Sequence, residues 1–181
     1  MRALADGDRI HRFMRALGAV STADARVYFT GGATAVLHGW RESTIDVDIR
    51  IDPEHDALFR AIPQLKEHLQ INVELASPDQ FIPVKDGWED RSPFVAREGR
   101  VSFHHFDLYA QALSKIERGH AQDEEDVREL LRRGLVERAA LRAYFDAIAP
   151  HLYRYPALDP VWFRRAVDEA VGHDDLTGPG Q

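Results

Sequence analysis

Three acidic residues on two strand-like segments are the residues of this sequence best suited to chemistry. Asp46 and Asp48 lie in the segment 45–49, and Glu74 lies in the segment 71–75. Because successive side chains of a strand alternate between its faces, Asp46 and Asp48 point to the same side. If the two strands pair, all three carboxylates converge. Converging carboxylates repel one another unless a cation lies between them, and oxygen ligands suit Mg²⁺ or Mn²⁺. The pattern predicts a divalent-metal site.

The apolar residues of these two segments occupy the alternate positions. In the first strand they are expected to face the core, and in the second they lie on the face opposite Glu74 and Asn72. They are Ile45, Val47 and Ile49 in the first segment, and Ile71, Val73 and Leu75 in the second.

A double glycine precedes the acids. Residues 26–29 predict a short strand that ends at Gly31 and Gly32, and residues 33–38 predict a brief helix closed by Gly39. A tight glycine turn lets backbone N–H groups approach a phosphate, and the following helix N-terminus adds partial positive charge. The turn is therefore a candidate triphosphate cradle, and the alternative is an ordinary turn. A phosphate-binding turn followed by three carboxylates is the arrangement that two-metal phosphoryl transfer requires.

The rest of the chain has a mixed α and β pattern. Periodicity predicts a first helix over about 6–18, a helix over 54–68, and a hairpin formed by 94–96 and 101–106. Helical segments follow at about 107–118, 123–133, 137–149 and 160–171. We expect an α/β (α+β) fold with a small mixed sheet flanked by helices and a helical C-terminal region.

Composition restricts the class of protein. The chain has 181 residues and no cysteine, which excludes disulfides and thiolate metal sites. No segment resembles a signal peptide or a membrane-spanning run, so we expect a cytoplasmic protein with no membrane partner. The net charge of −7 gives no general attraction for nucleic acid, although a local basic face can still bind RNA.

The motifs resemble those of a known superfamily. Gly31-Gly32, Asp46-x-Asp48 and Glu74 are similar to the signature of nucleotidyltransferases with the polymerase-β-like fold. More narrowly, residues 31–48 resemble the AbiEii-like toxin nucleotidyltransferases of abortive-infection systems and an allied bacterial family. Segments 87–91 and 113–127 resemble that branch as well.

The resemblance implies an activity and its partners. The enzyme would use Mg²⁺ or Mn²⁺ to transfer a nucleoside monophosphate from an NTP to an acceptor hydroxyl, with RNA, especially tRNA, as the acceptor and a cognate antitoxin as a protein partner. It also implies a nucleotidyltransferase core over residues 1–106 and a helical region over 107–173 packed on that core. Residues 174–181 are predicted to be a disordered tail.

Several further residues are candidates for binding the nucleotide. The family often has serine at the position of Gly32, so backbone groups or the hydroxyls of Thr30 and Thr34 would replace its side chain. Thr44 and Arg41 lie within the motif. Arg41 could bind a phosphate, and the alternative is an ion pair with Glu42 or Asp46.

Two charged residues of the C-terminal half are also candidates. Lys115 could reach the triphosphate as a point charge, and the alternative is a solvated helix lysine. Asp126 could orient Lys115 or Arg118, and the alternative is that it caps a helix, as Asp123 could. A basic patch of Arg132, Arg133, Arg138 and Arg142 lies near several acids.

Neighbouring histidines and three aromatic residues have simpler interpretations. His104 and His105 are adjacent in a strand and face opposite sides, so they cannot both bind one ion, and we expect one to be packed and one solvated. Trp88, Phe81 and Phe94 are expected to pack in the core rather than stack on a base.

The sequence therefore favours a metal-dependent nucleotidyltransferase in which Asp46, Asp48 and Glu74 bind metal and Gly31 and Gly32 hold the triphosphate. Glu74 is also expected to activate the acceptor hydroxyl. Two alternatives stay open: a nucleotide- or partner-binding module of a toxin–antitoxin or defence pair, and a nucleotidyltransferase that acts on a small molecule such as an antibiotic.

Overall fold

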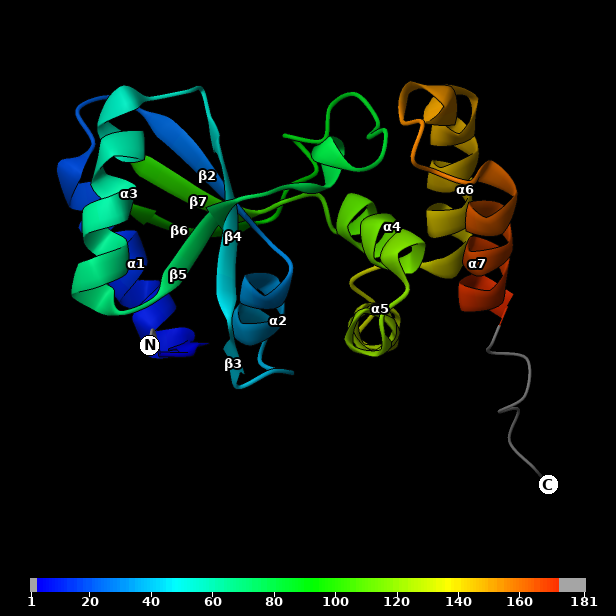
Figure 1. The fold of residues 1–181 in the computed structure, drawn as a ribbon, viewed down its shortest axis with the longest axis horizontal. Helices are drawn as coiled ribbons and strands as arrows, with labels where there is room; N and C mark the ends of the chain where they lie inside the picture. Colours follow the sequence, from blue (N-terminus) through cyan, green and yellow to red (C-terminus); the bar gives the residue numbers. More distant parts are fainter. Residues whose placement is uncertain (1–2, 173–181) are drawn as a thin grey trace. The chain divides into compact units, whose positions relative to one another are not determined.

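The computed structural model describes residues 3–172, so the tail predicted at 174–181 lies outside the described residues. This part of the chain forms two compact units. The first contains residues up to 77 together with 89–107, and the second contains 78–88 together with the residues from 108 onward. The segment 78–88 therefore leaves the first unit and belongs to the second (Figure 1).

The first unit is built on a mixed sheet with strand order β5-β4-β2-β7-β6. β2 runs antiparallel to β4 and parallel to β7, β4 runs parallel to β5, and β6 and β7 form an antiparallel hairpin. β5 and β6 are thus the edge strands. The strands are β2 (Ala25–Thr30), β4 (Asp46–Asp52), β5 (Asn72–Leu75), β6 (Phe94–Glu98) and β7 (Val101–His105).

Two amphipathic helices, α1 (Gly7–Val20) and α3 (Asp56–Leu69), pack together and against the sheet (Figure 1). Asp6 caps α1 by accepting a hydrogen bond from the backbone N–H of Arg9 at 2.9 Å. The apolar stripe of α1, formed by Ile10, Phe13, Met14 and Leu17, is buried with the alternate residues of β4, which are Val47, Ile49 and Ile51. Burial of this apolar face stabilises the unit.

A short helix and a small second sheet flank the ends of the strands. α2 (Gly32–His38) follows β2 directly and contacts β4, and it ends at Gly39 in the left-handed conformation with φ 92°. β1 (Ala5–Asp6) and β3 (Ser43–Thr44) pair antiparallel. The sequence pattern did not predict this small sheet, because strands of two residues carry no detectable alternation.

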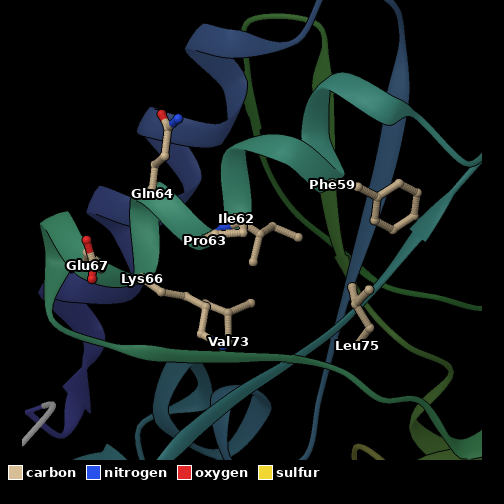
Figure 2. A pocket seen from close by; sticks show the side chains of 8 residues that line it. All are labelled: Phe59, Ile62, Pro63, Gln64, Lys66, Glu67, Val73 and Leu75. Carbon is tan, nitrogen blue, oxygen red and sulfur yellow. The ribbon is translucent and has the colours of Figure 1, made fainter.

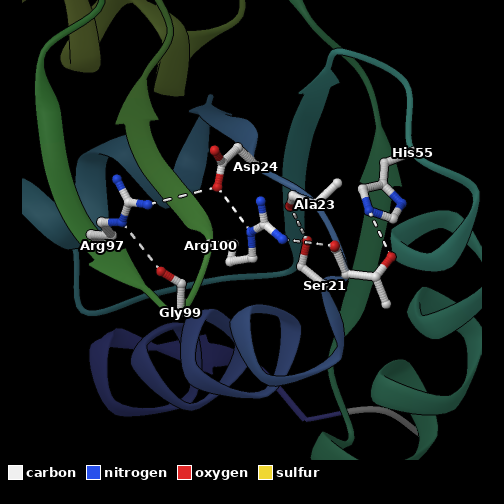
Figure 3. Close-up of polar contacts among 8 residues, drawn as sticks. Ser21, Ala23, Asp24, His55, Arg97, Gly99 and Arg100 are labelled. Carbon is white, nitrogen blue, oxygen red and sulfur yellow. Dashed lines mark hydrogen bonds and ion pairs between the residues drawn. The ribbon is translucent and has the colours of Figure 1, made fainter.

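Surface ion pairs hold the α1–β2 connection to the β6–β7 hairpin (Figure 3). Arg100 donates to Asp24 Oδ1 and to the carbonyl oxygen of Thr22, both at 3.0 Å, and Arg97 lies 3.8 Å from the same carboxylate. The hydrogen bond and charge of Arg100 lower the pKa of Asp24. These exposed contacts hold a loop in place, and we assign them a structural role.

The second unit is helical. α4 (Leu108–Arg118) packs on α5 (Ala121–Arg132), and α6 (Arg138–Ile148) packs on α7 (Pro160–Gly172). The 3-10 helices η1 (Pro78–Gln80) and η2 (Ala149–Arg154) complete it. Its core includes Leu130, Leu141, Phe145 and Phe163, with the rings of Phe145 and Phe163 in edge contact at 4.9 Å.

The mixed α/β fold with a helical C-terminal region is confirmed, and three predictions of packing in the core are wrong, those for Ile45, Phe81 and Phe94. Ile45 is 71% exposed because it lies at a bend between β3 and β4, where the alternation of β4 has not yet begun. Phe81 and Phe94 are exposed by 55% and 63%, whereas Trp88 is buried as predicted. Leu75 is half exposed because β5 is an edge strand.

A pocket lies between α3 and β5 and has a volume of about 560 Å³ (Figure 2). It is lined mainly by apolar side chains, among them Phe59, Ile62, Val73 and Leu75. Val73 and Leu75 alternate with Asn72 and Glu74 along β5, so the pocket lies on the face of the sheet opposite the acids. Among residues 3–172, no helix is long and apolar enough to cross a membrane.

Candidate active site

The three acids lie together on one face of the sheet. Asp46 and Asp48 are two residues apart in β4, and both are partly buried while Val47 between them is fully buried. β5 runs parallel to β4, with Glu74 directly beside Asp48 and Asn72 directly beside Asp46. The strand pairing on which the convergence of the acids depended is therefore present, and it brings the three acidic residues to adjacent positions of the sheet.

The glycine turn meets the acids at the end of β2. Gly31 has φ 63° and ψ −133°, a conformation that is open only to glycine at low cost. A Cβ atom added to Gly31 would lie 3.0 Å from Asp48 Oδ2, so the carboxylate of Asp48 packs directly against the turn. Thr30, the residue before the turn, is buried and pairs with Asp48 across the antiparallel strands.

Gly32 leaves room for two further side chains of the motif. A Cβ on Gly32 would overlap Thr44 Oγ1 and would lie 2.9 Å from Arg41 Nη1. Thr44 is buried, and its hydroxyl donates to the carbonyl oxygen of Asp46 at 2.9 Å. The structure thus gathers Gly31, Gly32, Arg41, Thr44 and Asp48 in one place, and the guanidinium of Arg41 supplies positive charge at the glycine turn.

The two threonines proposed as substitutes for the family serine are both buried, although Thr30, the strand partner of Asp48, lies on the face of the acids. Thr34 is 2% exposed, and its hydroxyl lies 3.0 Å from His105 Nδ1 and 3.4 Å from the carbonyl oxygen of Phe29. Its hydroxyl therefore serves the packing of α2 on the sheet. The Arg41 guanidinium and the glycine backbone are the groups better placed to meet a phosphate.

The donor set fits a hard divalent cation, but the site is not preassembled. All three acids offer carboxylate oxygens on adjacent strands, which is the chemistry that Mg²⁺ and Mn²⁺ prefer. Within the described residues, however, no group of three histidine, cysteine or acidic side chains stands close enough to hold a metal ion. The amide nitrogen of Asn72 lies between two of the acids, 2.5 Å from Asp46 Oδ1 and 3.1 Å from Glu74 Oε1.

Lys115 and Asp126 form a buried ion pair in the second unit. Lys115 Nζ lies 2.7 Å from Asp126 Oδ2 and 3.6 Å from Asp123 Oδ1, and all three side chains are at least 90% buried. Burial opposes ionisation of Asp123, but hydrogen bonds from Arg118 and the charges of Arg118 and Lys115 outweigh it, so its pKa is lowered. Lys115 is therefore not a solvated lysine, and Asp123 and Asp126 do more than cap α5.

Both histidines of the pair in β7 are buried, so the prediction that one would be solvated is wrong. The ring of His105 stacks on His38 of α2, with centroids 4.4 Å apart, and His104 Nδ1 lies 3.1 Å from the carbonyl oxygen of Ser92. Burial, reinforced by the charge of His38, lowers the pKa of His105 to about 3. Sequence periodicity could not show this, because the covering groups come from distant segments.

The arginines that the sequence groups as a basic patch are each engaged. Arg132 and Arg133 both contact Glu129, and Arg142 lies 3.4 Å from Asp168. Arg138 donates to the carbonyl oxygens of Ala170 and Val171 at the end of α7. The carboxylates of Glu129 and Asp168 offset part of the positive charge that the patch could offer to RNA.

Sequence reasoning placed Asn72 on the face of Glu74 but gave it no role. The alternation within β5 was the available signal. The register of β5 against β4 shows which acid of the other strand Asn72 meets, because it sets Asn72 beside Asp46.

Comparison with known proteins supports the reading of these motifs. A family model described as "Nucleotidyltransferase of unknown function (DUF6036)" matches residues 9–155, which include the glycine turn, all three acids and the Lys115–Asp126 pair. No curated protein and no solved structure matches the chain significantly. Because the match spans most of the sequence, the chain belongs to the DUF6036 family of nucleotidyltransferases of unknown function.

Proposed function

We propose that this protein is a metal-dependent nucleotidyltransferase that transfers a nucleoside monophosphate from an NTP to an acceptor hydroxyl. The observation that carries the proposal is the meeting of the glycine turn with the acids. Asp48 Oδ2 lies 3.0 Å from the position of a Cβ on Gly31, and Glu74 lies beside Asp48 in the sheet. A phosphate held at the turn would therefore lie next to the carboxylates.

Each residue has a role in this proposal. Asp46, Asp48 and Glu74 would hold Mg²⁺ or Mn²⁺, which when bound supplies electrostatic stabilisation to the reacting phosphate. The backbone at Gly31 and Gly32 and the guanidinium of Arg41 would bind the triphosphate oxygens. Thr44 holds the backbone of the acid strand through its hydrogen bond to the carbonyl of Asp46, and buried Thr30 fixes the start of the turn.

Glu74 is the group proposed to activate the acceptor, because it is the exposed member of the three acids. The acceptor oxygen forms a bond to the α-phosphorus while the bond from that phosphorus to the bridging oxygen of pyrophosphate breaks. The hydroxyl proton passes to the carboxylate of Glu74, and pyrophosphate leaves with the bonding electrons. Lys115 is carried in the proposal as a cation for the nucleotide and Asp126 as the carboxylate that orients it, on the basis of the family resemblance and their ion pair.

The acceptor proposed for the first test is tRNA, and a cognate antitoxin is the proposed protein partner. Both rest on the resemblance of the motifs to AbiEii-like toxin enzymes. The arginines of the second unit that form ion pairs with Glu129 and Asp168 do not distinguish RNA from other acceptors. The alternative acceptor is therefore a small hydroxylated molecule such as an antibiotic.

A second candidate function keeps the fold without the chemistry. The absence of a preassembled metal cluster among residues 3–172, together with Gly32 at the position where the family often has serine, favours a nucleotide- or partner-binding module. Such a module would bind an NTP or a protein partner and would release no pyrophosphate.

The test is a transfer assay with purified protein, Mg²⁺, each labelled NTP and total tRNA, in which labelled RNA and pyrophosphate are measured. Asp48→Ala should abolish transfer and leave the fold intact, because one partly buried acid contributes little to packing. Asp52→Ala is the matched control, because Asp52 lies on the same face of β4 at its far end.

The outcomes separate the candidates. Labelled RNA that disappears in the Asp48→Ala variant supports the proposal and identifies the nucleotide, and pyrophosphate without labelled RNA points to a small-molecule or protein acceptor. Unchanged turnover in Asp48→Ala would refute the assignment of the site. NTP binding without pyrophosphate release would favour the binding module.

A further inference from the structure

Asn72 makes two hydrogen bonds that join two of the proposed metal ligands. Its amide nitrogen lies 2.5 Å from Asp46 Oδ1 and 3.1 Å from Glu74 Oε1. Carboxylate oxygens only accept hydrogen bonds, so the group that faces both of them must be the amide NH₂, which carries two donors. The side chain of Asn72 therefore bridges one acid of β4 and one acid of its own strand.

Backbone register fixes the position of this bridge. Asn72 is the parallel partner of Asp46, and Glu74 is the parallel partner of Asp48. Asn72 is partly buried and has a short side chain, so its amide has few other positions available near the sheet. The two carboxylates are thus drawn toward the same point from neighbouring strands.

The chemical type of the bridge matters for a cation site. A lysine or arginine between Asp46 and Glu74 would add positive charge and would repel an incoming metal ion. An amide orients the carboxylates through charge-assisted hydrogen bonds and leaves their negative charge in place. The neutral bridge opposes the mutual repulsion of the two acids without reducing their attraction for a divalent cation.

We infer that Asn72 is a positioning residue for the carboxylate site, which holds Asp46 and Glu74 in converging orientations before a divalent cation binds. The inference rests on the proposed function, because it assumes that these acids bind a metal ion. Groups that orient metal ligands typically change metal affinity by about 10–100-fold when they are removed. Asn72 should act on metal affinity through the acids, without itself taking part in the chemistry.

The test measures Mn²⁺ binding to the full-length protein by electron paramagnetic resonance, without nucleotide. Asn72→Val removes the amide and keeps a side chain that suits a strand, and it should raise the Kd for Mn²⁺ by about tenfold or more. Asn72→Gln returns the amide and should restore most of the affinity. Asp52→Asn, on the same face of β4 but away from the bridge, should leave the Kd unchanged.

A second readout in EDTA needs no metal. Thermal unfolding of Asn72→Val, Asp46→Asn and the double variant forms a cycle, and Asn72→Val alone should lower the Tm by about 2–4 °C. In the Asp46→Asn background the same substitution should cost less, because one of the two bonds is already weakened. This coupling would show that the bridge exists in the folded protein, and an additive cycle would overturn it.

The outcomes distinguish failure of this inference from failure of the proposed function. If the wild-type protein binds Mn²⁺ and Asn72→Val binds it equally well or more tightly, the role of Asn72 is refuted and the metal site stands. If neither the wild type nor any variant binds Mn²⁺, the metal-dependent function is overturned and the role of Asn72 falls with it. Circular dichroism of each variant shows that an altered Kd does not reflect unfolding.

Discussion

His105 should make the folded state sensitive to acid. Its ring is 5% exposed, lies 3.0 Å from the hydroxyl of Thr34 and stacks on His38, and its pKa is lowered to about 3 from an ordinary 6.5. Burial is the main cause, with the charges of His38 and His104 adding to it. The folded protein therefore holds this imidazole neutral at a pH at which the unfolded chain binds a proton.

The sign and size of the effect follow from proton linkage. Because the pKa is lower in the folded state, the stabilisation is fully present above about pH 6.5 and is lost as the pH falls toward 3. Between about pH 7.5 and about pH 5 the free energy of unfolding should fall by about 2 kcal/mol because of this group. The titration of other groups adds to the total, so the contribution of His105 is the difference between two proteins.

The assay compares urea unfolding of the wild type and His105→Asn at about pH 7.5 and about pH 5. Asparagine does not titrate here and can still bond to Thr34, so its pH dependence should be smaller than that of the wild type by about 2 kcal/mol. His68→Gln serves as the control, because His68 is exposed. Equal pH dependence in the wild type and His105→Asn would refute the buried neutral imidazole.

Two further substitutions test the packing around the candidate residues. Asp126→Asn leaves the buried ammonium of Lys115 without its nearest carboxylate, and urea unfolding should show a free energy of unfolding lower by about 3 kcal/mol. The double variant with Lys115→Met should recover part of this loss. If the losses of the two single variants simply add, the ion pair is contradicted. Gly32→Ala should cost about 1–3 kcal/mol and weaken NTP binding measured by calorimetry, because the new methyl group displaces Thr44 and Arg41. Gly7→Ala is its control, since a Cβ there meets open space, and equal behaviour of the two variants would contradict the close packing at Gly32.

The secondary structure could be predicted wherever one face of an element is buried. The stripe of Ile10, Phe13 and Leu17 indicated α1, and the alternation from Asp46 onward indicated β4, because each pattern reflects burial in a single core. Ile45 shows where this reasoning stops. One residue before β4 begins, the chain bends out of β3, and the alternation assigns that side chain to a core it does not reach.

The candidate site was predictable to the extent that it follows from alternation along single strands. That rule placed Asp46 with Asp48 and Glu74 with Asn72, but it could not say which residues of β4 and β5 become neighbours. The amide of Asn72 meets Asp46 across 26 positions of sequence, and that contact depends on the register alone. Burial of both His104 and His105 likewise depends on segments that no local pattern identifies.

The two acidic clusters of this protein differ in the groups that hold them. In the second unit Asp123 and Asp126 form ion pairs with Lys115 and Arg118, so positive charge on the neighbouring side chains offsets their negative charge. In the first unit the group that joins Asp46 and Glu74 is a neutral amide, on a partly exposed face of the sheet. Carboxylates that are brought together by a neutral donor retain their attraction for a cation from solution, whereas carboxylates bound to lysine and arginine lose most of it. This difference, rather than the number of acids, is the physical reason why we propose metal binding at β4 and β5 and orientation of Lys115 by Asp126.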